Sequence, residues 1–168
     1  MIIVRAETPE DVVAVHQVNE AAFGRVEEAA LVDALRAAAR PYISLVAEVG
    51  GRVVGHIFFS PVTLETEERP HTLLGLAPMS VLPEYQNQGI GSRLVREGLS
   101  ECRRAGCDAV VVLGHPEYYP RFGFVPASRN GLSCEYPVPD EAFMVAELTP
   151  GGLSAQGRVK YRPEFGEV

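Results

Sequence analysis

The chain has 168 residues, of which 46% are hydrophobic, with a mean hydropathy of +0.04 and a formal net charge of −7. These values predict one globular domain and argue against nucleic acid or an anionic membrane as the main partner, since both repel an acidic protein. The N-terminus lacks a basic segment followed by a long apolar one, and no apolar run approaches a membrane span, so we expect a cytoplasmic protein without a membrane partner.

The first part of the chain predicts a short strand followed by two helices. Residues 2–7 (IIVRAE) are rich in strand formers, and the stretch Thr8–Asp11 is a helix start, with a threonine cap, a proline and an acid. We expect this first helix to stop at Gly24. A second helix is expected from about Glu27, with acids in its first turn, and should end before Pro41.

The pattern then changes to that of strands. Residues 44–49 (SLVAEV) and 52–64 (RVVGHIFFSPVTL) consist largely of strand formers, and Gly50-Gly51 between them is a hairpin turn signal. Residues 71–82 (HTLLGLAPMSVL) predict a further apolar strand. The segment 65–70 (ETEERP) predicts a charged loop between the two.

The second part of the chain alternates between helix and strand. A helix with one broad apolar face is expected from Ile90 and should finish at Gly106. Residues 109–114 (AVVVLG) predict a strand that is buried on both faces. Residues 115–124 (HPEYYPRFGF) predict a short helix or turn, and 143–148 (FMVAEL) a last strong strand.

The tail 149–168 is weakly patterned, although RVKY within it predicts one edge strand. The order of elements is β-α-α-β-β-β-α-β-α-β-β, which favours an α/β fold with a mixed sheet and helices on both sides. We expect residues 1–168 to form a single domain, with a core over about 1–148 and a C-terminal extension after it.

The cysteines Cys102, Cys107 and Cys134 form no CxxC pair, and no histidine stands at metal-ligand spacing to another. Free thiols in a reducing compartment and no bound metal are therefore expected.

A glycine loop connects the third long strand to the next helix. In PEYQNQGIGSRL, residues 83–94, the glycines at 89 and 91 remove side chains where the chain enters a helix. The first amides of a helix have no internal partners and favour an anion. The Rossmann and Walker A patterns both fail here, and a tight strand-to-helix turn without a ligand is the simpler alternative.

Two motifs resemble the GCN5-related N-acetyltransferases, the GNAT family. Gln86 to Gly91 (QNQGIG) match that family's acetyl-CoA signature Q/R-x-x-G-x-G/A, after a strand that ends in Val-x-Pro. LGHPEYYPRFGF is similar to the family's last signature, with Tyr119 five residues before Phe124, in a form typical of small bacterial members. The resemblance covers nearly the whole chain to about residue 148. It implies a GNAT-type, mostly antiparallel sheet of about six to seven strands flanked by about four helices.

The resemblance also implies a donor site and a reaction. Acetyl-CoA would be the cosubstrate, its pyrophosphate on the loop amides and its pantetheine arm along the preceding strand. Tyr119 would protonate the thiolate leaving group, since a phenol is protonated at neutral pH; its alternative role is packing beside CoA, and Tyr118 is the adjacent competitor. The implied cofactor-binding residues are Met79, Ser80, Val81, Gln86, Asn87, Gln88, Gly89, Ile90, Gly91 and Ser92.

The general base stays open, because the strand LGLAPMSV contains none of the glutamates that many family members carry there. Candidates are His115, whose simpler interpretation is a polar helix entry, and Glu20, Glu27 and Glu28, whose simpler interpretation is solvated helix ends. Water relayed through one of them is a further choice. His56 lies in a strand pattern and is expected to be structural.

The expected activity is transfer of an acetyl group to a small-molecule or peptide amine by direct attack in a ternary complex. An oxygen or sulfur acceptor is the alternative, as is a CoA-binding sensor that has lost transfer. The acceptor's identity, the length of the acyl group, the role of 149–168 and a homodimeric state stay open.

Overall fold

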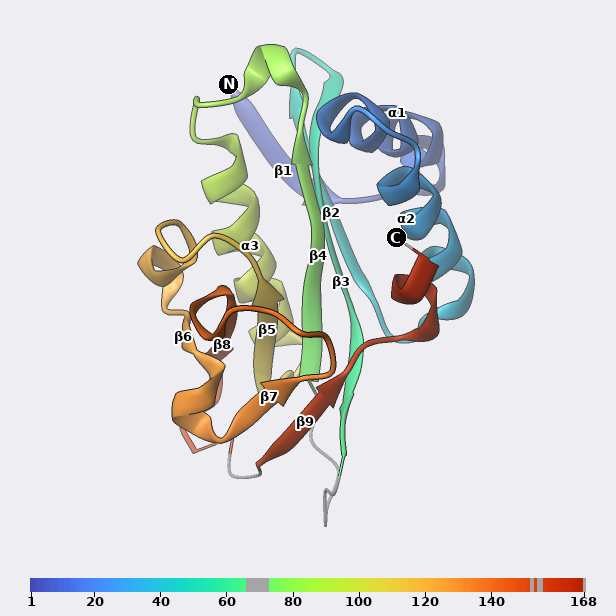
Figure 1. Cartoon of the computed structure of the whole chain (residues 1–168). Coiled ribbons are helices and arrows are strands. Elements are labelled where there is room, and N and C mark those ends of the chain that lie inside the picture. Colours follow the sequence, from blue (N-terminus) through green and yellow to red (C-terminus); the bar gives the residue numbers. More distant parts are fainter. Residues whose placement is uncertain (66–72, 152, 154–155, 168) are drawn as a thin grey trace. The chain divides into compact units, whose positions relative to one another are not determined.

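The computed structural model describes residues 1–65, 73–151, 153 and 156–167 (Figure 1). Within these ranges lie three α-helices: α1 (Val12–Phe23), α2 (Glu27–Ala38) and α3 (Ile90–Arg104). The strands there are β1 (Ile2–Ala6), β2 (Ile43–Val49), β3 (Arg52–Leu64), β4 (Leu73–Val81), β5 (Ala109–Leu113), β6 (Val125–Pro126), β7 (Leu132–Cys134), β8 (Phe143–Glu147) and β9 (Gly157–Lys160). Short 3₁₀ helices include η1 (Pro9–Asp11), η2 (Pro83–Tyr85), η3 (Tyr119–Phe122), η4 (Ala127–Asn130), η5 (Asp140–Ala142) and η6 (Pro163–Glu167).

The chain forms two compact units, each assembled from separate stretches of sequence. The first unit comprises Met1–Ser60, Ala77–Gly98 and Pro163–Val168. The second unit comprises Pro61–Leu76 and Leu99–Arg162. Strands β3 and β4 and helix α3 each contribute residues to both units, so neither unit is a continuous piece of the chain.

In the first unit, α3 packs against one face of β3, and α1 and α2 pack against the other. β2 pairs antiparallel with β1 and with β3, and Gly50 and Gly51 form the β2–β3 turn with φ values of 57° and 81°. Because side chains alternate along a strand, Gly55 and Phe59 face α3, whereas Phe58 faces α1 and α2.

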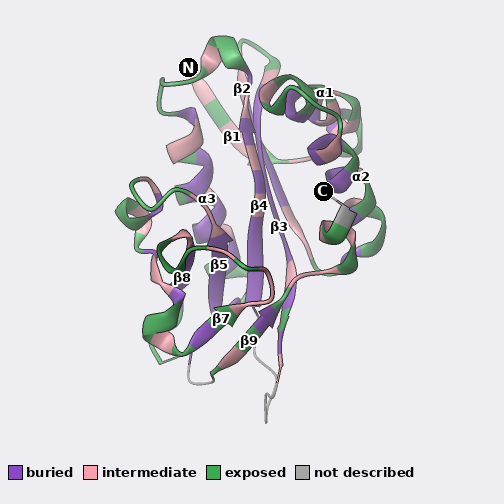
Figure 2. Cartoon of the chain, in the orientation of Figure 1, coloured by how far each residue is buried: buried purple, intermediate pink, exposed green. Residues whose placement is uncertain are grey.

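The core under α1 and α2 also receives a side chain from η6. Figure 2 shows the buried residues following the inner sides of these helices and strands. Phe165 of η6 packs against this cluster, as do Tyr42 and Val53. Its buried members are Val15, Leu31, Val32, Leu35, Ala39, Val46 and Phe58.

Helix α3 approaches β3 closely at Gly98. A Cβ atom on Gly98 would lie 2.5 Å from Cε1 and 2.6 Å from Cζ of Phe59, a fully buried ring. We expect Gly98→Ala to lower the free energy of unfolding by about 1–2 kcal/mol, because overpacking costs more than the helix propensity that alanine adds. Urea unfolding measures this. Ser100→Ala, at an exposed position of the same helix, should leave stability unchanged or slightly raised, and equal stability of both variants would contradict the predicted overlap.

The second unit is built around β5. β4 pairs with β5 in parallel over Leu73–Leu76, and β8 pairs antiparallel with both β5 and β6. β9 pairs in parallel with β7 and antiparallel with the end of β3. The buried core residues of the second unit are Val62, Leu64, Leu73, Ala109, Val111, Ala127, Leu132, Phe143, Val145, Leu153 and Val159.

Most elements agree with the sequence-based expectations, including the stop at Gly24, the hairpin at Gly50-Gly51, the strand in the tail and the burial of Ala109–Val112. The mixed, mostly antiparallel fold is confirmed, but the element counts differ slightly. The expected fourth helix is the 3₁₀ turn η3, and Thr8–Asp11 opens a 3₁₀ turn before α1. β6 and β7 have two and three residues, too short for a periodic pattern. The expected loop 65–70 lies outside the described residues after Glu65.

Candidate functional site

Hydrogen bonds from side chains of the glycine loop to nearby backbone carbonyls hold the conformation of this loop. Nε2 of Gln86 donates to the carbonyl of Val81 at 3.0 Å, and Nε2 of Gln88 donates to the carbonyl of Glu84 at 3.3 Å. Asn87 and Gly89 both adopt left-handed backbone conformations, with φ values of 63° and 86°. Left-handed residues in a turn are a feature of backbone concavities whose N–H groups bind anions.

Helix α3 begins directly after this loop. Its first hydrogen bond runs from the N–H of Arg93 to the carbonyl of Gly89, 3.1 Å apart, so the N–H groups of residues 90–92 precede the intrahelical ladder. The Ile90 side chain is buried and lies against Gly55, so it anchors the start of α3 to β3. The guanidinium of Arg93 donates to Glu97 and to the carbonyl of Ile2.

The expected pantetheine-binding residues lie at the end of β4. Met79, Ser80 and Val81 follow Leu76, the last residue of β4 in register with β5. The N–H of Leu82 donates to the carbonyl of Val54 on β3. Ser80 is buried, and its hydroxyl has no hydrogen-bond partner among the described residues.

Tyr119 lies in the second unit, in a compact aromatic group. Its ring contacts Tyr118, Phe122 and Phe124 edge-on, with centroid distances of 5.1, 6.4 and 5.6 Å. A Cβ on Gly114 would overlap Cε2 of Tyr119, so the ring needs glycine at that position. Burial, with a smaller effect of Tyr118, raises the pKa of Tyr119 to about 12. The phenol therefore keeps its proton throughout the neutral range.

The candidate bases have different surroundings. His115 is exposed, and its backbone carbonyl accepts from the N–H groups of Tyr118 and Tyr119. Glu28 is bound by Nε of Arg25 at 2.9 Å, and Glu27 lies 3.3 Å from Nη1 of the same arginine. Glu20 is exposed and contacts His16, with Oε2 3.5 Å from Nε2.

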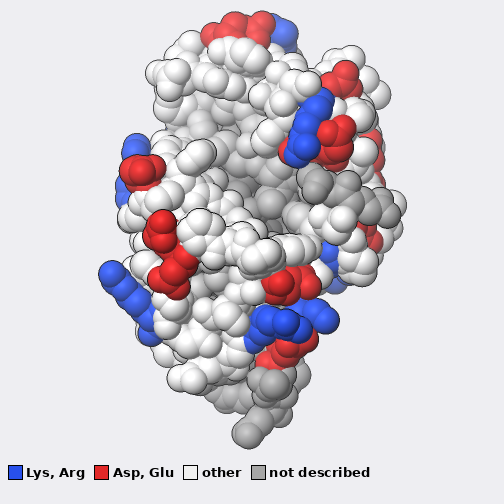
Figure 3. All heavy atoms as spheres, in the orientation of Figure 1, with Lys and Arg blue, Asp and Glu red and all other residues white. Residues whose placement is uncertain are grey.

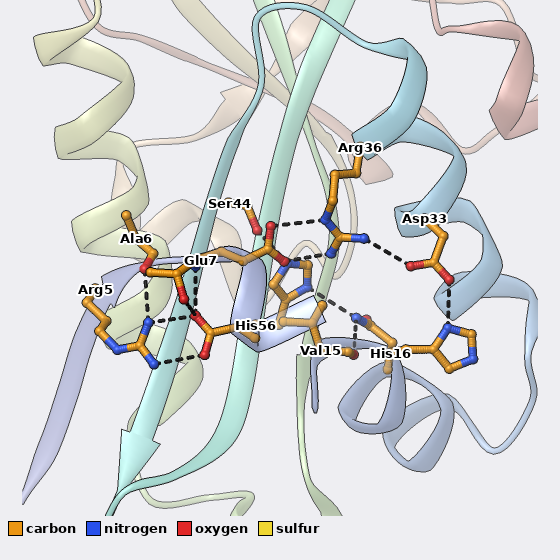
Figure 4. A network of polar contacts seen from close by, with 12 residues as sticks. Arg5, Ala6, Glu7, Val15, His16, Asp33, Arg36, Ser44 and His56 are labelled. Carbon is orange, nitrogen blue, oxygen red and sulfur yellow. Dashed lines mark hydrogen bonds and ion pairs between the residues drawn. The ribbon is translucent and has the colours of Figure 1, made fainter. Parts of the chain in front are cut away.

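His56 is fully buried at the centre of a polar cluster in the first unit (Figure 4). Asn19 Nδ2 donates to the carbonyl of Val15 at 3.0 Å, and this orients the amide so that its second hydrogen points to Nδ1 of His56, 3.2 Å away. Nε2 of His56 then carries the proton and donates to Oγ of Ser44 at 2.9 Å. Both ring nitrogens are occupied, as the structural interpretation of His56 predicts.

Stability should depend on pH through His56. Burial, with a smaller contribution from Arg36, lowers the pKa of His56 from 6.5 to about 3. The fold favours the neutral ring, so its contribution is complete above pH 6.5 and is lost as the pH falls toward 3. We expect the free energy of unfolding to fall by about 1.4 kcal/mol per pH unit in this window from this group. Urea unfolding between pH 7.5 and 5 measures the slope.

Two variants separate this effect from other titrations. His56→Gln removes the buried ring and should flatten the slope by about one proton. Ser100→Ala, at an exposed position of α3, removes no titratable group and should leave the slope unchanged. A slope that is identical in the wild type and His56→Gln would contradict the assignment.

A second network of polar contacts, next to that of His56, was not predicted from the sequence. Glu7 accepts from Arg36, with Oε1 2.6 Å from Nη2, and Arg36 also donates to Oδ1 of Asp33 at 2.9 Å (Figure 4). Oδ2 of Asp33 lies 2.8 Å from Nδ1 of His16. The other ring nitrogen of His16 contacts Glu20, which is one helical turn further along α1. The sequence signals were that His16 and Glu20 are four residues apart on one helix and that Asp33 and Arg36 are three apart on the next.

Glu20 lines an open depression beside the α1–α2 turn, with a volume of about 400 Å³. We call it the α1–α2 depression; its lining residues are Gln17, Glu20, Ala21, Gly24, Arg25 and Val26.

Surface charges of opposite sign lie next to one another. Arg158 donates to Glu65 at 2.9 Å, and Lys160 lies 3.4 Å from the same carboxylate. Figure 3 shows acidic and basic side chains as neighbours on the face that it presents.

The three cysteines are free, with Cys102 and Cys107 buried, and burial raises the pKa of all three thiols. Across the described ranges, no group of three or more His, Cys, Asp or Glu side chains could hold a metal ion. Nor is any helix in that part of the chain long and apolar enough to cross a membrane.

The chain is similar to known proteins over most of its length. Residues 3–127 match the family model of the acetyltransferase (GNAT) domain. The chain is 41% identical over 152 residues to YjhQ of Escherichia coli K12, an uncharacterized N-acetyltransferase, covering 87% of this chain and 84% of that protein. It is 36% identical over 166 residues to YhbS of the same strain, also an uncharacterized N-acetyltransferase, covering 98% of both.

Two solved structures are similar over almost the full chain. The crystal structure of YhbS from Escherichia coli in complex with CoA has a TM-score of 0.91 at 35% identity, covering 98% of this chain and 92% of that one. A GNAT family acetyltransferase from Brucella melitensis, in complex with acetyl-CoA, has a TM-score of 0.81 at 40% identity, covering 98% of both chains.

Proposed function

Because the chain belongs to the GNAT family of acetyltransferases, we propose that it transfers an acetyl group from acetyl-CoA to an amine by direct attack in a ternary complex. The observation that carries the proposal is the loop before α3. Two left-handed residues there precede the start of a helix, whose first turn of N–H groups comes before the intrahelical hydrogen bonds. An anionic pyrophosphate is the ligand that this arrangement favours.

The donor site would extend from the loop into β4. Residues 86–92 would hold the pyrophosphate, chiefly through main-chain N–H groups, because Gln86 and Gln88 already donate within the loop. Met79–Val81 would pair with the pantetheine amides through their backbone, beyond the part of β4 that is in register with β5. The N–H of Val81 would stabilise the oxyanion of the tetrahedral intermediate.

Tyr119 would donate a proton to the departing thiolate. Its phenol is buried and protonated at neutral pH, and its ring is fixed by neighbouring aromatic side chains and by Gly114. A positioned acid of this kind removes the cost of releasing a bare thiolate.

The proposal is tested first by calorimetry with acetyl-CoA and then by turnover. A panel of primary amines is incubated with the protein and acetyl-CoA, free thiol is detected, and the acetylated product is identified by mass. Binding together with amine-dependent thiol release is expected. Binding without transfer to any amine, alcohol or thiol would instead favour a CoA-binding sensor, and absence of binding would contradict the donor site.

A further inference from the structure

The Asp33–His16 pair has the geometry of an oriented base. Asp33 lies 2.8 Å from Nδ1 of His16, and its other oxygen accepts from Arg36. Arg36 is held in turn by Glu7, whose side chain is only 6% exposed, so Asp33 is fixed from the interior (Figure 4). A carboxylate that accepts from Nδ1–H leaves the lone pair of the neutral ring on Nε2.

Nε2 of His16 faces Glu20, and Glu20 faces the α1–α2 depression. The two side chains are 3.5 Å apart, and the Glu20 side chain is 55% exposed. Glu27 and Glu28 are both engaged by Arg25, as described above. Of the three candidate glutamates, Glu20 thus combines exposure at the depression with contact to a histidine.

Resting on the proposed transfer to an amine, we propose that Glu20 takes the proton of the acceptor ammonium in the α1–α2 depression and that His16, held by Asp33, relays it to solvent. The N–H bond of the ammonium breaks, its electron pair stays on nitrogen, and the proton forms an O–H bond with Glu20. The proton then moves from Glu20 to Nε2 of His16. Because the His16 side chain is 32% exposed, it can release the proton to water. Glu20 is the catalytic residue here, and His16 and Asp33 are positioning residues.

The protons balance over one turnover. The ammonium loses one proton to Glu20 before attack, and the tetrahedral intermediate loses a second proton from nitrogen directly to water. The thiolate gains one from Tyr119, which regains a proton from solvent. The net products are the amide, CoA thiol and one released proton.

Charged and titratable groups on α1, on α2 and after β1 lie in the contact network of His16. Glu20 lies on α1, Asp33 and Arg36 on α2, and Glu7 after β1. On the strand side, the group that faces α1 is His56, which is buried and neutral at physiological pH. The cations near this pair are Arg36, which Glu7 and Asp33 neutralise, and Arg25 at the α1–α2 depression, which Glu27 and Glu28 neutralise.

The relay predicts a change in pH dependence. His16→Gln should lower kcat/KM at pH 7 for the best primary amine of the panel by about tenfold or more. The loss should shrink as the pH rises, because bulk water then deprotonates the amine unaided. Hydroxylamine, whose nitrogen is largely unprotonated at pH 7, should react equally with both proteins. Glu20→Gln should behave like His16→Gln, and Asp33→Asn should give a smaller loss in the same direction.

Val13→Gln serves as the matched control, because Val13 is on the same helix and 68% exposed. It should leave all profiles unchanged. A loss in His16→Gln that is uniform across pH and across both nucleophiles indicates a structural role and overturns the relay, as does an unaltered profile with the primary amine. Either result leaves acetyl transfer standing. A wild-type protein that transfers to hydroxylamine alone overturns the relay, and one that binds no acetyl-CoA and acetylates nothing overturns both proposals.

Discussion

Replacing Tyr119 by phenylalanine is expected to lower kcat by about 100-fold with little change in acetyl-CoA affinity. The change removes only the hydroxyl that would protonate the thiolate, and a positioned acid contributes on the order of 10²–10⁴ in rate. The aromatic contacts with Phe122 and Phe124 stay in place. Release of free thiol at saturating acceptor measures kcat, and calorimetry measures the affinity.

Tyr118→Phe is the matched control for this prediction. Tyr118 is the neighbouring phenol, with its ring edge-on to Tyr119 and its face 4.7 Å from the guanidinium carbon of Arg121. Phenylalanine keeps both ring contacts, so kcat should be unchanged. Full activity of Tyr119→Phe together with a loss in Tyr118→Phe would show that the two roles had been exchanged.

The second large effect is expected at Gly89, where valine should weaken acetyl-CoA binding by about 30-fold or more. Gly89 has a φ of 86°, a conformation that costs a β-branched residue roughly 1–3 kcal/mol. Its Cβ would meet no protein atom within 4 Å, so the side chain would project into open space beside the N–H groups of α3. Both the strain and the bulk act where the pyrophosphate is expected, and calorimetry reports the loss.

Gly106→Val separates backbone strain from loss of the ligand site. Gly106 follows α3 with a φ of 87°, and a Cβ there also meets nothing within 4 Å. The two variants therefore carry similar strain, and only Gly89→Val should lose affinity. Equal acetyl-CoA affinities of the two variants would contradict the assignment of this loop to the donor site.

Local signals explain what could be predicted from the sequence. Gly24, Gly50 and Gly51 have positive φ values, and glycine is the residue that tolerates them, so the turns were visible in the residues themselves. The loop at 86–91 is likewise continuous in sequence, and its motif therefore stands out.

Contacts between distant segments explain what was missed. Glu7 and Arg36 are 29 positions apart, and His16 and Asp33 are 17 apart, so no local pattern marks either pair. The partners of His56 come from α1 and β2, and only the packed structure brings Asn19 and Ser44 to its two nitrogens. β7 has three residues and depends on its pairing with β9, so it lacks a periodic signal.

The dependence of the first unit on η6 has a consequence for biosynthesis. Phe165 packs against the cluster beneath α1 and α2, yet it is translated more than a hundred residues after those helices. While the ribosome is still at work, the nascent chain therefore presents the apolar side of α2 without its final cover. Such exposed surfaces are where chaperones bind and aggregation begins. A chain that ends before Pro163 would keep that apolar surface exposed.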